Sequence, residues 1–365
     1  MRPTSARPSS DRPTSAWADE PAALRDEDAF DVAAVHAFLL DRGVEGLTAP
    51  PQVQQFAGGA SNLTYLLRYP DRDLVLRRPP GGTKAASAHD MAREHRVQER
   101  LRPAYPYVPR MVALCQDPAV LGTDFYVMER VPGLVLRRRL PEGLDLTPEQ
   151  ARGLGLRAVD RLVELHAVDP AAAGLADLGR GPGYVGRQVS GWSQRFRAAR
   201  TDDVPDLEAV MGWLAAQQPP DVGARLVHND WRLDNLVLDA ALEVVGVLDW
   251  EMATVGDPLM DLGGALAYWV QADDDDVFRA ARRQPTDLPG MPTRAEVVAH
   301  YAAATGRPVD DWPFYEVFGL FRLAVIVQQI WYRYVHGQTT NPAFQYFGFF
   351  VAHLDERCRR VAGLA

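Results

Sequence analysis

The segment His228-Asn229-Asp230-Trp231-Arg232-Leu233-Asp234-Asn235 decides how the chain is interpreted, and Val247-Leu248-Asp249-Trp250-Glu251 follows it closely. Asp230 and Asn235 stand five residues apart, so one rigid loop can present a carboxylate and an amide oxygen. Asp249 adds a second carboxylate at the end of a strand-like run. Carboxylate and amide oxygens are hard ligands of the kind that Mg²⁺ prefers. The pattern therefore predicts a Mg²⁺ site beside a further carboxylate.

The residue types in this segment are those that phosphoryl transfer from a nucleotide requires. That reaction needs a carboxylate near the acceptor hydroxyl, ligands for Mg²⁺, and cationic groups at the phosphates. We predict that Asp230 is the base, that Asn235 and Asp249 hold the metal, and that Arg232 stabilises charge on the transferred group. His228 is predicted to pin the loop rather than to act in catalysis.

The eight-residue segment resembles the catalytic loop of kinases position by position: His, x, Asp, x, basic, x, acidic, Asn. Asp249-Trp250-Glu251 resembles the metal-binding Asp-Trp-Glu of the aminoglycoside phosphotransferase family. Gly256-Asp257-Pro258 and Asp261-Leu262-Gly263 resemble that family's Gly-Asp-Pro…Asp-Leu stretch. The resemblance covers about Phe56 to Tyr268. It implies an α+β, protein-kinase-like fold with two lobes, and it implies ATP and Mg²⁺ as cofactors.

One branch of this family is especially similar. Arg232-Leu233-Asp234-Asn235, with Leu76-Arg77-Arg78-Pro79-Pro80-Gly81 upstream, is similar to the kinase-like domains of acyl-CoA dehydrogenase fusion proteins. By resemblance, a hydroxylated acyl group or another small hydroxy compound is the expected acceptor.

A glycine-containing turn, Ala57-Gly58-Gly59-Ala60-Ser61-Asn62, lies between two strand-like runs near the N-terminus. Its backbone N–H groups could cover phosphates, although the turn lacks the full glycine-rich kinase pattern and also fits an ordinary hairpin. The nucleotide-binding residues expected here are Gly58, Gly59, Ser61 and Asn62.

Kinases carry a lysine on the next strand, and here the residue in that place is Arg77 in Val75-Leu76-Arg77. Arg78 points to the opposite face of the strand by alternation. The chain has a single lysine, Lys84, which follows Gly81-Gly82 and is the competing candidate. We favour Arg77, because the guanidinium fork suits the α- and β-phosphates.

The resemblance also assigns residues around the nucleotide. Glu94, on the following helix, resembles the glutamate that pairs with the strand cation. Phe125 to Gly133 resembles the linker between lobes, where Met128 is the gatekeeping side chain and the backbone from Glu129 to Val131 bonds the adenine edge.

Three other aspartates have two interpretations each. Asp234 is expected to bond either the substrate or a nearby arginine, whereas Asp257 and Asp261 either cap a helix or bond the loop backbone. The run Asp273 to Asp276 could attract a cationic substrate, but such runs are usually solvated loops. Aromatic residues crowd the last helices, where Arg322 and Arg333 could recognise an anionic group.

Composition sets the outer limits. The 365 residues are 47% hydrophobic and 24% charged, which fits a globular protein with two domains or lobes. The net charge of −9 argues against a general nucleic-acid binder. Cys115 and Cys358 form no CxxC, so neither a zinc site nor a disulfide scaffold is expected. No signal peptide opens the chain, and Val317 to Trp331 is too short for a membrane span, so we expect a cytoplasmic protein.

The changes in composition and hydrophobic periodicity along the chain predict three parts. Residues 1–28 form a disordered tail, residues 29–130 a nucleotide-binding lobe of strands and one helix, and residues 131–365 a helical lobe with the catalytic loop and the substrate pocket.

Together these features predict an ATP- and Mg²⁺-dependent phosphotransferase that acts on a hydroxyl of a small molecule. A catalytically silent nucleotide-binding or scaffold protein is one alternative, and an aminoglycoside-modifying enzyme is another. A protein kinase is disfavoured, because Asp249 to Asp261 leaves no room for an activation segment. The sequence leaves open the acceptor, the oligomeric state and the choice between ATP and GTP.

Overall fold

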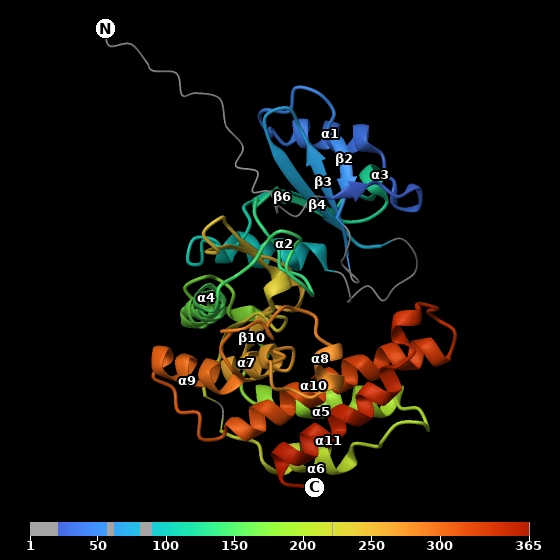
Figure 1. The fold of residues 1–365 in the computed structure, drawn as a ribbon. Helices are drawn as coiled ribbons and strands as arrows, with labels where there is room; N and C mark the ends of the chain where they lie inside the picture. The colour runs from blue at the N-terminus through green and yellow to red at the C-terminus, as the bar shows by residue number, and fades with distance from the viewer. Residues whose placement is uncertain (1–20, 57–61, 81–89, 221, 365) are drawn as a thin grey trace.

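Two lobes of different composition make up the computed structural model, which describes residues 21–56, 62–80, 90–220 and 222–364. The smaller lobe is built on a sheet and the larger lobe on helices, as Figure 1 shows. The predicted α+β fold with two lobes is therefore confirmed.

The N-terminal lobe contains one antiparallel sheet with the strand order β1-β2-β3-β4-β6-β5. Its strands are β1 (Ala22–Ala23), β2 (Gln52–Gln55), β3 (Leu63–Arg68), β4 (Asp73–Arg78), β5 (Met111–Cys115) and β6 (Phe125–Glu129). Its helices are α1 (Val32–Asp41), α2 (Met91–Leu101) and the short α3 (Pro118–Leu121).

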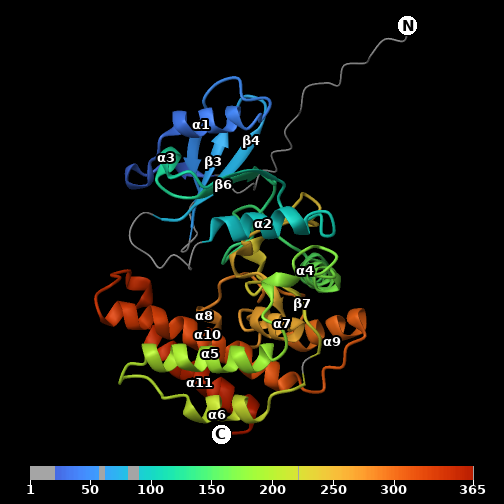
Figure 2. The same cartoon turned by 180° about the vertical axis from the view of Figure 1, so that it is seen from behind.

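Strand alternation divides the side chains of β4 between two hydrophobic cores. Leu74 and Leu76 pack with α1 on one face of the sheet. Val75 packs with Met91 of α2 and with Met128 on the other face. The α2 face is the one turned toward the helical lobe (Figure 2). Residues that share the Val75 face of β4 therefore point toward the junction between the lobes.

The N-terminal lobe begins earlier than predicted, because residues 21–28 are not part of a tail. Ala22 and Ala23 pair with Gln55 and Gln54 of β2. The Gln55 amide donates to Asp28 Oδ2 at 2.8 Å, and Tyr65 donates to the Asp28 carbonyl at 2.9 Å. A strand of two residues carries no periodic pattern, and its position depends on these distant partners.

The larger lobe consists of eight helices and two small strand pairs within the described residues. The helices are α4 (Pro148–Ala167), α5 (Tyr184–Ala199), α6 (Glu208–Ala216), α7 (Pro258–Leu266), α8 (Asp276–Ala280), α9 (Arg294–Thr305), α10 (Trp312–Val335) and α11 (Phe347–Ala362). The strand pairs join β7 (Arg225–Val227) to β10 (Thr254–Gly256) and β8 (Leu236–Leu238) to β9 (Val244–Val247).

Helix α10 is central to this lobe and packs against α5, α7 and α11. By length and composition it is the one described helix that could cross a membrane, and 72% of its most apolar window is buried inside the fold. That burial is typical of the core helix of a globular domain.

The segment that joins the lobes is fixed to the β8–β9 hairpin. Leu134 and Leu238 exchange backbone hydrogen bonds of 2.8 Å in both directions. Gly133 lies so close to β8 that a Cβ there would stand 2.4 Å from the Leu238 carbonyl oxygen. Only glycine allows this approach, so the linker is held next to the segment that follows the catalytic loop.

Candidate active site

The β8–β9 hairpin brings the end of the predicted catalytic loop and Asp249 together. The loop follows β7 and ends in a 3₁₀ turn, Leu233–Asn235, immediately before β8. Asp249 follows β9, the partner of β8, and its left-handed backbone (φ 66°) turns the chain there. The Leu248 N–H donates to the Asn235 carbonyl at 2.8 Å. The predicted metal ligands Asn235 and Asp249 therefore come from adjacent ends of one hairpin.

The loop backbone is held by a buried carboxylate, that of Asp261 in α7. It accepts the N–H groups of His228 and Asn229 at 2.7 and 2.8 Å. His166 of α4 lies 3.2 Å away through Nε2. Burial opposes ionisation, but these hydrogen bonds lower the pKa of Asp261 below its ordinary value. Asp261 therefore bonds the loop backbone, and Asp257 is the residue that caps α7.

The contacts of His228 are those of an anchor. Its Nε2 donates to the Leu248 carbonyl at 3.0 Å, while Nδ1 accepts the Asp230 N–H at 3.3 Å. One ring nitrogen is thus a donor and the other an acceptor, which assigns the neutral imidazole. The ring also makes edge contacts with Trp231 and Trp250. No ring nitrogen is left to accept a proton from a substrate.

The carboxylate of Asp230 is positioned by two neighbours in its own loop. Asn235 Nδ2 donates to Asp230 Oδ2 at 3.0 Å and to the Asp230 carbonyl at 2.8 Å. Arg232 Nη2 lies 3.2 Å from the same Oδ2. Because the Asn235 amide turns its nitrogen to Asp230, its oxygen is the atom that faces away and can bind a cation.

Arg232 also pairs with Asp234, at 3.0 Å, and lies 5.1 Å over the ring of Tyr268. Of the two interpretations of Asp234, the arginine contact is the one present in the structure. Burial raises the pKa of Asp234, although attraction to Arg232 works in the opposite direction.

Arg77 lies at the junction between the lobes, on the Val75 face of β4. Its Nη1 is 3.1 Å from Glu94 of α2, and its Nη2 is 2.9 Å from Asp249. Burial disfavours the charge, but Glu94 and Asp249 outweigh it and raise the pKa of Arg77 further. Arg78 points away and donates to the Tyr65 hydroxyl and the Asp28 carbonyl. The predicted alternation and the predicted Arg77–Glu94 pair are therefore both present.

Not all of the expected nucleotide contacts can be placed. Gly58, Gly59, Ser61 and the competing Lys84 lie outside the described residues. Asn62 is buried at the start of β3, and its amide donates to Glu251 Oε2 at 2.9 Å, which links the two lobes.

The predicted linker residues Met128, Glu129 and Val131 differ in their burial and in their hydrogen bonds. Met128, in the strand β6 that leads into the linker, is buried against Val75 and Met91. The Glu129 N–H donates to the Arg110 carbonyl at 2.8 Å, so that donor is already occupied. Its side chain pairs with Arg72 and Arg110 on the outside. Val131 is half-buried where the linker leaves the sheet.

The donor chemistry fits a Mg²⁺ ion shared with a phosphate-bearing ligand. In the described part of the chain, no three His, Cys, Asp or Glu side chains gather into a protein cage for a metal. Asp249 instead offers a carboxylate that is 30% exposed, and Asn235 offers its amide oxygen from the adjacent end of the same hairpin. Mg²⁺ is commonly bound by one or two such ligands together with water and phosphates.

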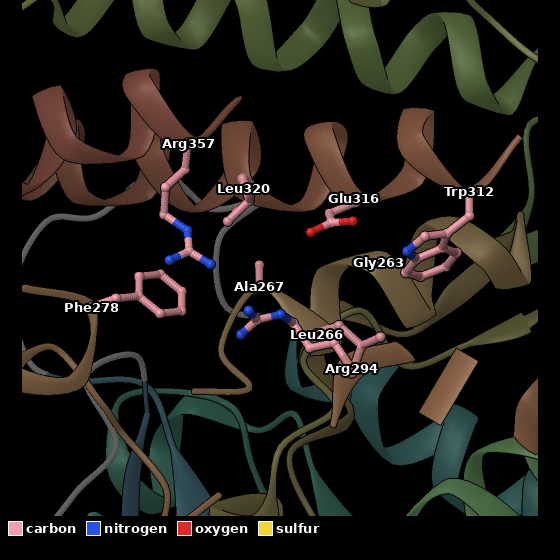
Figure 3. Close-up of a pocket in the computed structure, with 9 residues that line it drawn as sticks. All are labelled: Gly263, Leu266, Ala267, Phe278, Arg294, Trp312, Glu316, Leu320 and Arg357. Atoms are coloured by element: carbon pink, nitrogen blue, oxygen red, sulfur yellow. The ribbon is translucent and has the colours of Figure 1, made fainter. Parts of the chain in front are cut away.

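The acidic run Asp273 to Asp276 is solvated except at Asp274. Asp274 is buried and binds Arg294 at 2.7 Å and Arg357 at 3.0 Å. Figure 3 shows these two arginines beside Phe278, where they line a small cavity. Asp274 therefore ties the segment before α8 to α9 and α11, whereas Asp273, Asp275 and Asp276 are exposed.

Several contacts near the site carry no signal in the sequence. Tyr301 lies 2.8 Å from His166 Nδ1, although the two are 135 positions apart. Arg93 donates to the carbonyls of Glu251 and Ala253 from the other lobe. Arg322 donates to the Asn229 carbonyl at 2.6 Å. Such pairs depend on tertiary structure, and a local pattern cannot predict them.

Comparison with known proteins agrees with this geometry. The model of the phosphotransferase enzyme family matches residues 52–315. Acyl-CoA dehydrogenase family member 10 of Mus musculus is 37% identical over 325 residues, which are 87% of this chain and 30% of the mouse protein. Acyl-CoA dehydrogenase family member 11 of Homo sapiens is 31% identical over 337 residues, which are 90% of this chain and 42% of the human protein. The chain thus spans less than half the length of these relatives.

Solved structures show the same fold. A Ralstonia eutropha protein assigned as an aminoglycoside phosphotransferase has a TM-score of 0.78 at 32% identity, covering 92% of this chain and 99% of that one. An ethanolamine kinase of Plasmodium vivax has a TM-score of 0.56 at 11% identity, covering 87% and 85%. A complex of aminoglycoside phosphotransferase APH(4)-Ia with ADP and hygromycin B has a TM-score of 0.54 at 15% identity, covering 91% and 99%. With its two lobes, its loop and its matched residues, the chain belongs to the phosphotransferase enzyme family.

Proposed function

We propose that this chain transfers the γ-phosphate of ATP to a hydroxyl of a small molecule and requires Mg²⁺. The observation that supports this most directly is the placement of Asp230. Its carboxylate is fixed by Asn235 and Arg232, within one hairpin of Asp249. Membership of the family supports a phosphotransferase in general, and the geometry supports the individual roles.

In the proposed reaction, Asp230 accepts the proton of the acceptor hydroxyl. The acceptor oxygen then forms a bond to the γ-phosphorus while the bond between that phosphorus and the bridging oxygen of ADP breaks. Arg232 stabilises the negative charge that spreads over the transferred group. Its guanidinium contacts the Asp230 carboxylate, so the cation and the base lie side by side at the proposed site of phosphate transfer.

Two further groups would hold the nucleotide. Arg77, oriented by Glu94, would bind the α- and β-phosphates, and its Nη2 is 2.9 Å from Asp249. Asn235 and Asp249 would hold Mg²⁺, which neutralises charge on phosphate oxygens when bound. The backbone from Glu129 to Val131 would bond the adenine edge.

The test is a phosphorylation screen of small hydroxy compounds, read by mass spectrometry of the products and by ADP release. Asp230→Asn is expected to lower kcat by roughly 10² to 10⁴-fold, the usual contribution of a general base. Asp276→Asn, an exposed change of the same kind, should leave kcat unchanged. Turnover that persists undiminished in Asp230→Asn would refute the mechanism. ATP binding without turnover of any acceptor would instead favour the silent nucleotide-binding alternative.

An aminoglycoside acceptor is less well supported than a neutral or anionic one. Aminoglycosides carry several ammonium groups, which need several carboxylates for recognition. The one acidic run of the helical lobe has its buried member, Asp274, committed to Arg294 and Arg357. The hygromycin B complex is 15% identical to this chain and supports the fold alone.

A further inference from the structure

Arg322 of α10 differs from the other buried arginines around the site. Its side chain is 8% exposed, yet among the described residues no carboxylate lies within 4.0 Å of its guanidinium. Arg77 is just as buried but has Glu94 and Asp249 as partners. A buried charge is costly unless it is paired. Arg322 therefore keeps a positive charge that no described carboxylate neutralises at contact distance.

Two neutral contacts orient this guanidinium. Nη2 donates to the Asn229 carbonyl at 2.6 Å, and the charge centre lies 5.3 Å from the ring of Trp192 in α5. Gly264 of α7 leaves room for Nη1, because a Cβ there would stand 3.0 Å from it. Helices α5, α7 and α10 thus jointly fix the group.

The guanidinium also keeps an edge that a ligand can reach. Its Nε and Nη1 have no hydrogen-bond partner in the described structure. Neither nitrogen is fully buried, so both remain accessible to solvent. Two directional donors are therefore free on a cation that cannot move far. Such a fork matches the oxygens of a carboxylate or phosphate.

The guanidinium lies beside the loop that carries the proposed base. Arg322 binds the carbonyl of Asn229, the residue directly before Asp230. The phenol of Tyr268 lies close enough to Asp230, Arg232, Arg283 and Arg322 to be influenced by all four charges, and burial raises its pKa. Arg232 is committed to Asp230 and Asp234, whereas Arg322 is paired with neither.

From this geometry we propose that Arg322 binds an oxyanion of the acceptor, so that the substrate is a hydroxy compound bearing a carboxylate or phosphate. The inference rests on the proposed phosphotransfer and specifies its substrate class. Exposed Arg283, which like Arg322 acts electrostatically on Tyr268, adds positive charge near this acceptor subsite. An acceptor with several ammonium groups would be repelled there.

The first experiment measures binding without turnover, by ligand-observed saturation-transfer NMR on the full chain. The probes are butanoate, butanamide and ethyl phosphate, at low ionic strength. Arg322→Gln should weaken the binding of butanoate and of ethyl phosphate by about 10- to 100-fold, which is the usual effect of losing a hydrogen bond to a charged group. Butanamide should bind equally to both proteins. Arg322→Lys should retain part of the anion affinity.

Arg333 provides the matched control, because it lies on the same helix but is exposed. Arg333→Gln should leave all three affinities unchanged. The second experiment compares 3-hydroxybutanoate, 3-hydroxybutanamide and 4-amino-2-butanol as acceptors. Arg322→Gln should raise KM for the carboxylate by 10-fold or more and leave KM for the amide unchanged.

The two hypotheses fail in different ways. If Arg322→Gln raises KM equally for the amide, the amine and the carboxylate, the subsite proposal is overturned while phosphotransfer stands. The same holds if the amine is the preferred acceptor. If the anionic probes bind through Arg322 but Asp230→Asn does not alter turnover, the proposed reaction fails while the subsite stands. If ethyl phosphate binds and butanoate does not, the oxyanion is a phosphate rather than a carboxylate.

Discussion

Replacing Arg77 with methionine is expected to destabilise the protein by about 3–5 kcal/mol, the usual cost of removing one partner of a buried ion pair. The reason is Glu94, which is 2% exposed and loses the cation 3.1 Å away. Asp249 also loses this partner, but it is 30% exposed and can be hydrated instead. The penalty should therefore arise almost entirely at Glu94.

This assignment predicts that a second substitution restores stability. In Arg77→Met/Glu94→Gln, no buried charge is left alone, and stability should return to within about 1–2 kcal/mol of the original protein. The coupling energy between the two changes should then be at least about 1 kcal/mol, the smallest difference between the losses of the Arg77→Met and double variants. Nucleotide binding should not return, because the proposed phosphate-binding cation is absent from both variants.

Urea denaturation of the four proteins in the cycle measures the free energies of unfolding, provided that the m-values agree. Titration with ATP and Mg²⁺ measures binding in the same samples. The exposed pair Arg197–Glu208 is the matched control, and its coupling should be too small to resolve. Additive effects of the Arg77 and Glu94 substitutions would refute the argument, and so would ATP binding that survives in the double variant.

Three further predictions concern the helical lobe. Asp261→Asn should destabilise the protein by roughly 3 kcal/mol. The carboxylate accepts hydrogen bonds from His228, Asn229 and His166, and in the variant one of these buried donors faces the N–H group of the amide. Equal unfolding midpoints for this variant and Asp276→Asn would contradict this. The pKa of Asp261 is depressed below 3.8, so its contribution is present above that pH and lost as the pH falls through the lower folded value; denaturation of both proteins from pH 7 to pH 2.5 should show their difference shrinking. Gly263→Ala should cost about 1–3 kcal/mol or more, because its Cβ would stand 2.4 Å from the Tyr315 carbonyl, whereas Gly212→Ala, with open space, should raise Tm slightly.

The catalytic loop could be predicted because its residues are close in sequence. Asp230 and Asn235 share a loop, and a short hairpin returns Asp249 to them. The choice of Arg77 over Arg78 needed only strand alternation, since the two side chains of β4 point to opposite faces. Each of these inferences uses a spacing that the backbone geometry fixes locally.

Other contacts could not be predicted, because they join residues that no periodicity relates. The order of residues 21–28 depends on Gln55 and Tyr65. Asp274 looked like one charge in a solvated run, and only the packing of α8 against α9 and α11 shows that it is neutralised. Arg322 was one of two equivalent arginines in the sequence, and its burial beside Asn229 separates it from Arg333.

The attachment of α2 to the other lobe has a consequence for how the chain tolerates substitution. Arg93 binds the main-chain carbonyls of Glu251 and Ala253, and the side chain of Met252 between them is exposed. A main-chain carbonyl is present whatever residue occupies a position, so residue 252 is free to vary without loss of the hydrogen bonds from Arg93. Arg93 has no such freedom, because the donors belong to its side chain. In a random library, recovery of folded variants should therefore be far more permissive at residue 252 than at residue 93, although the two segments lie at the same junction.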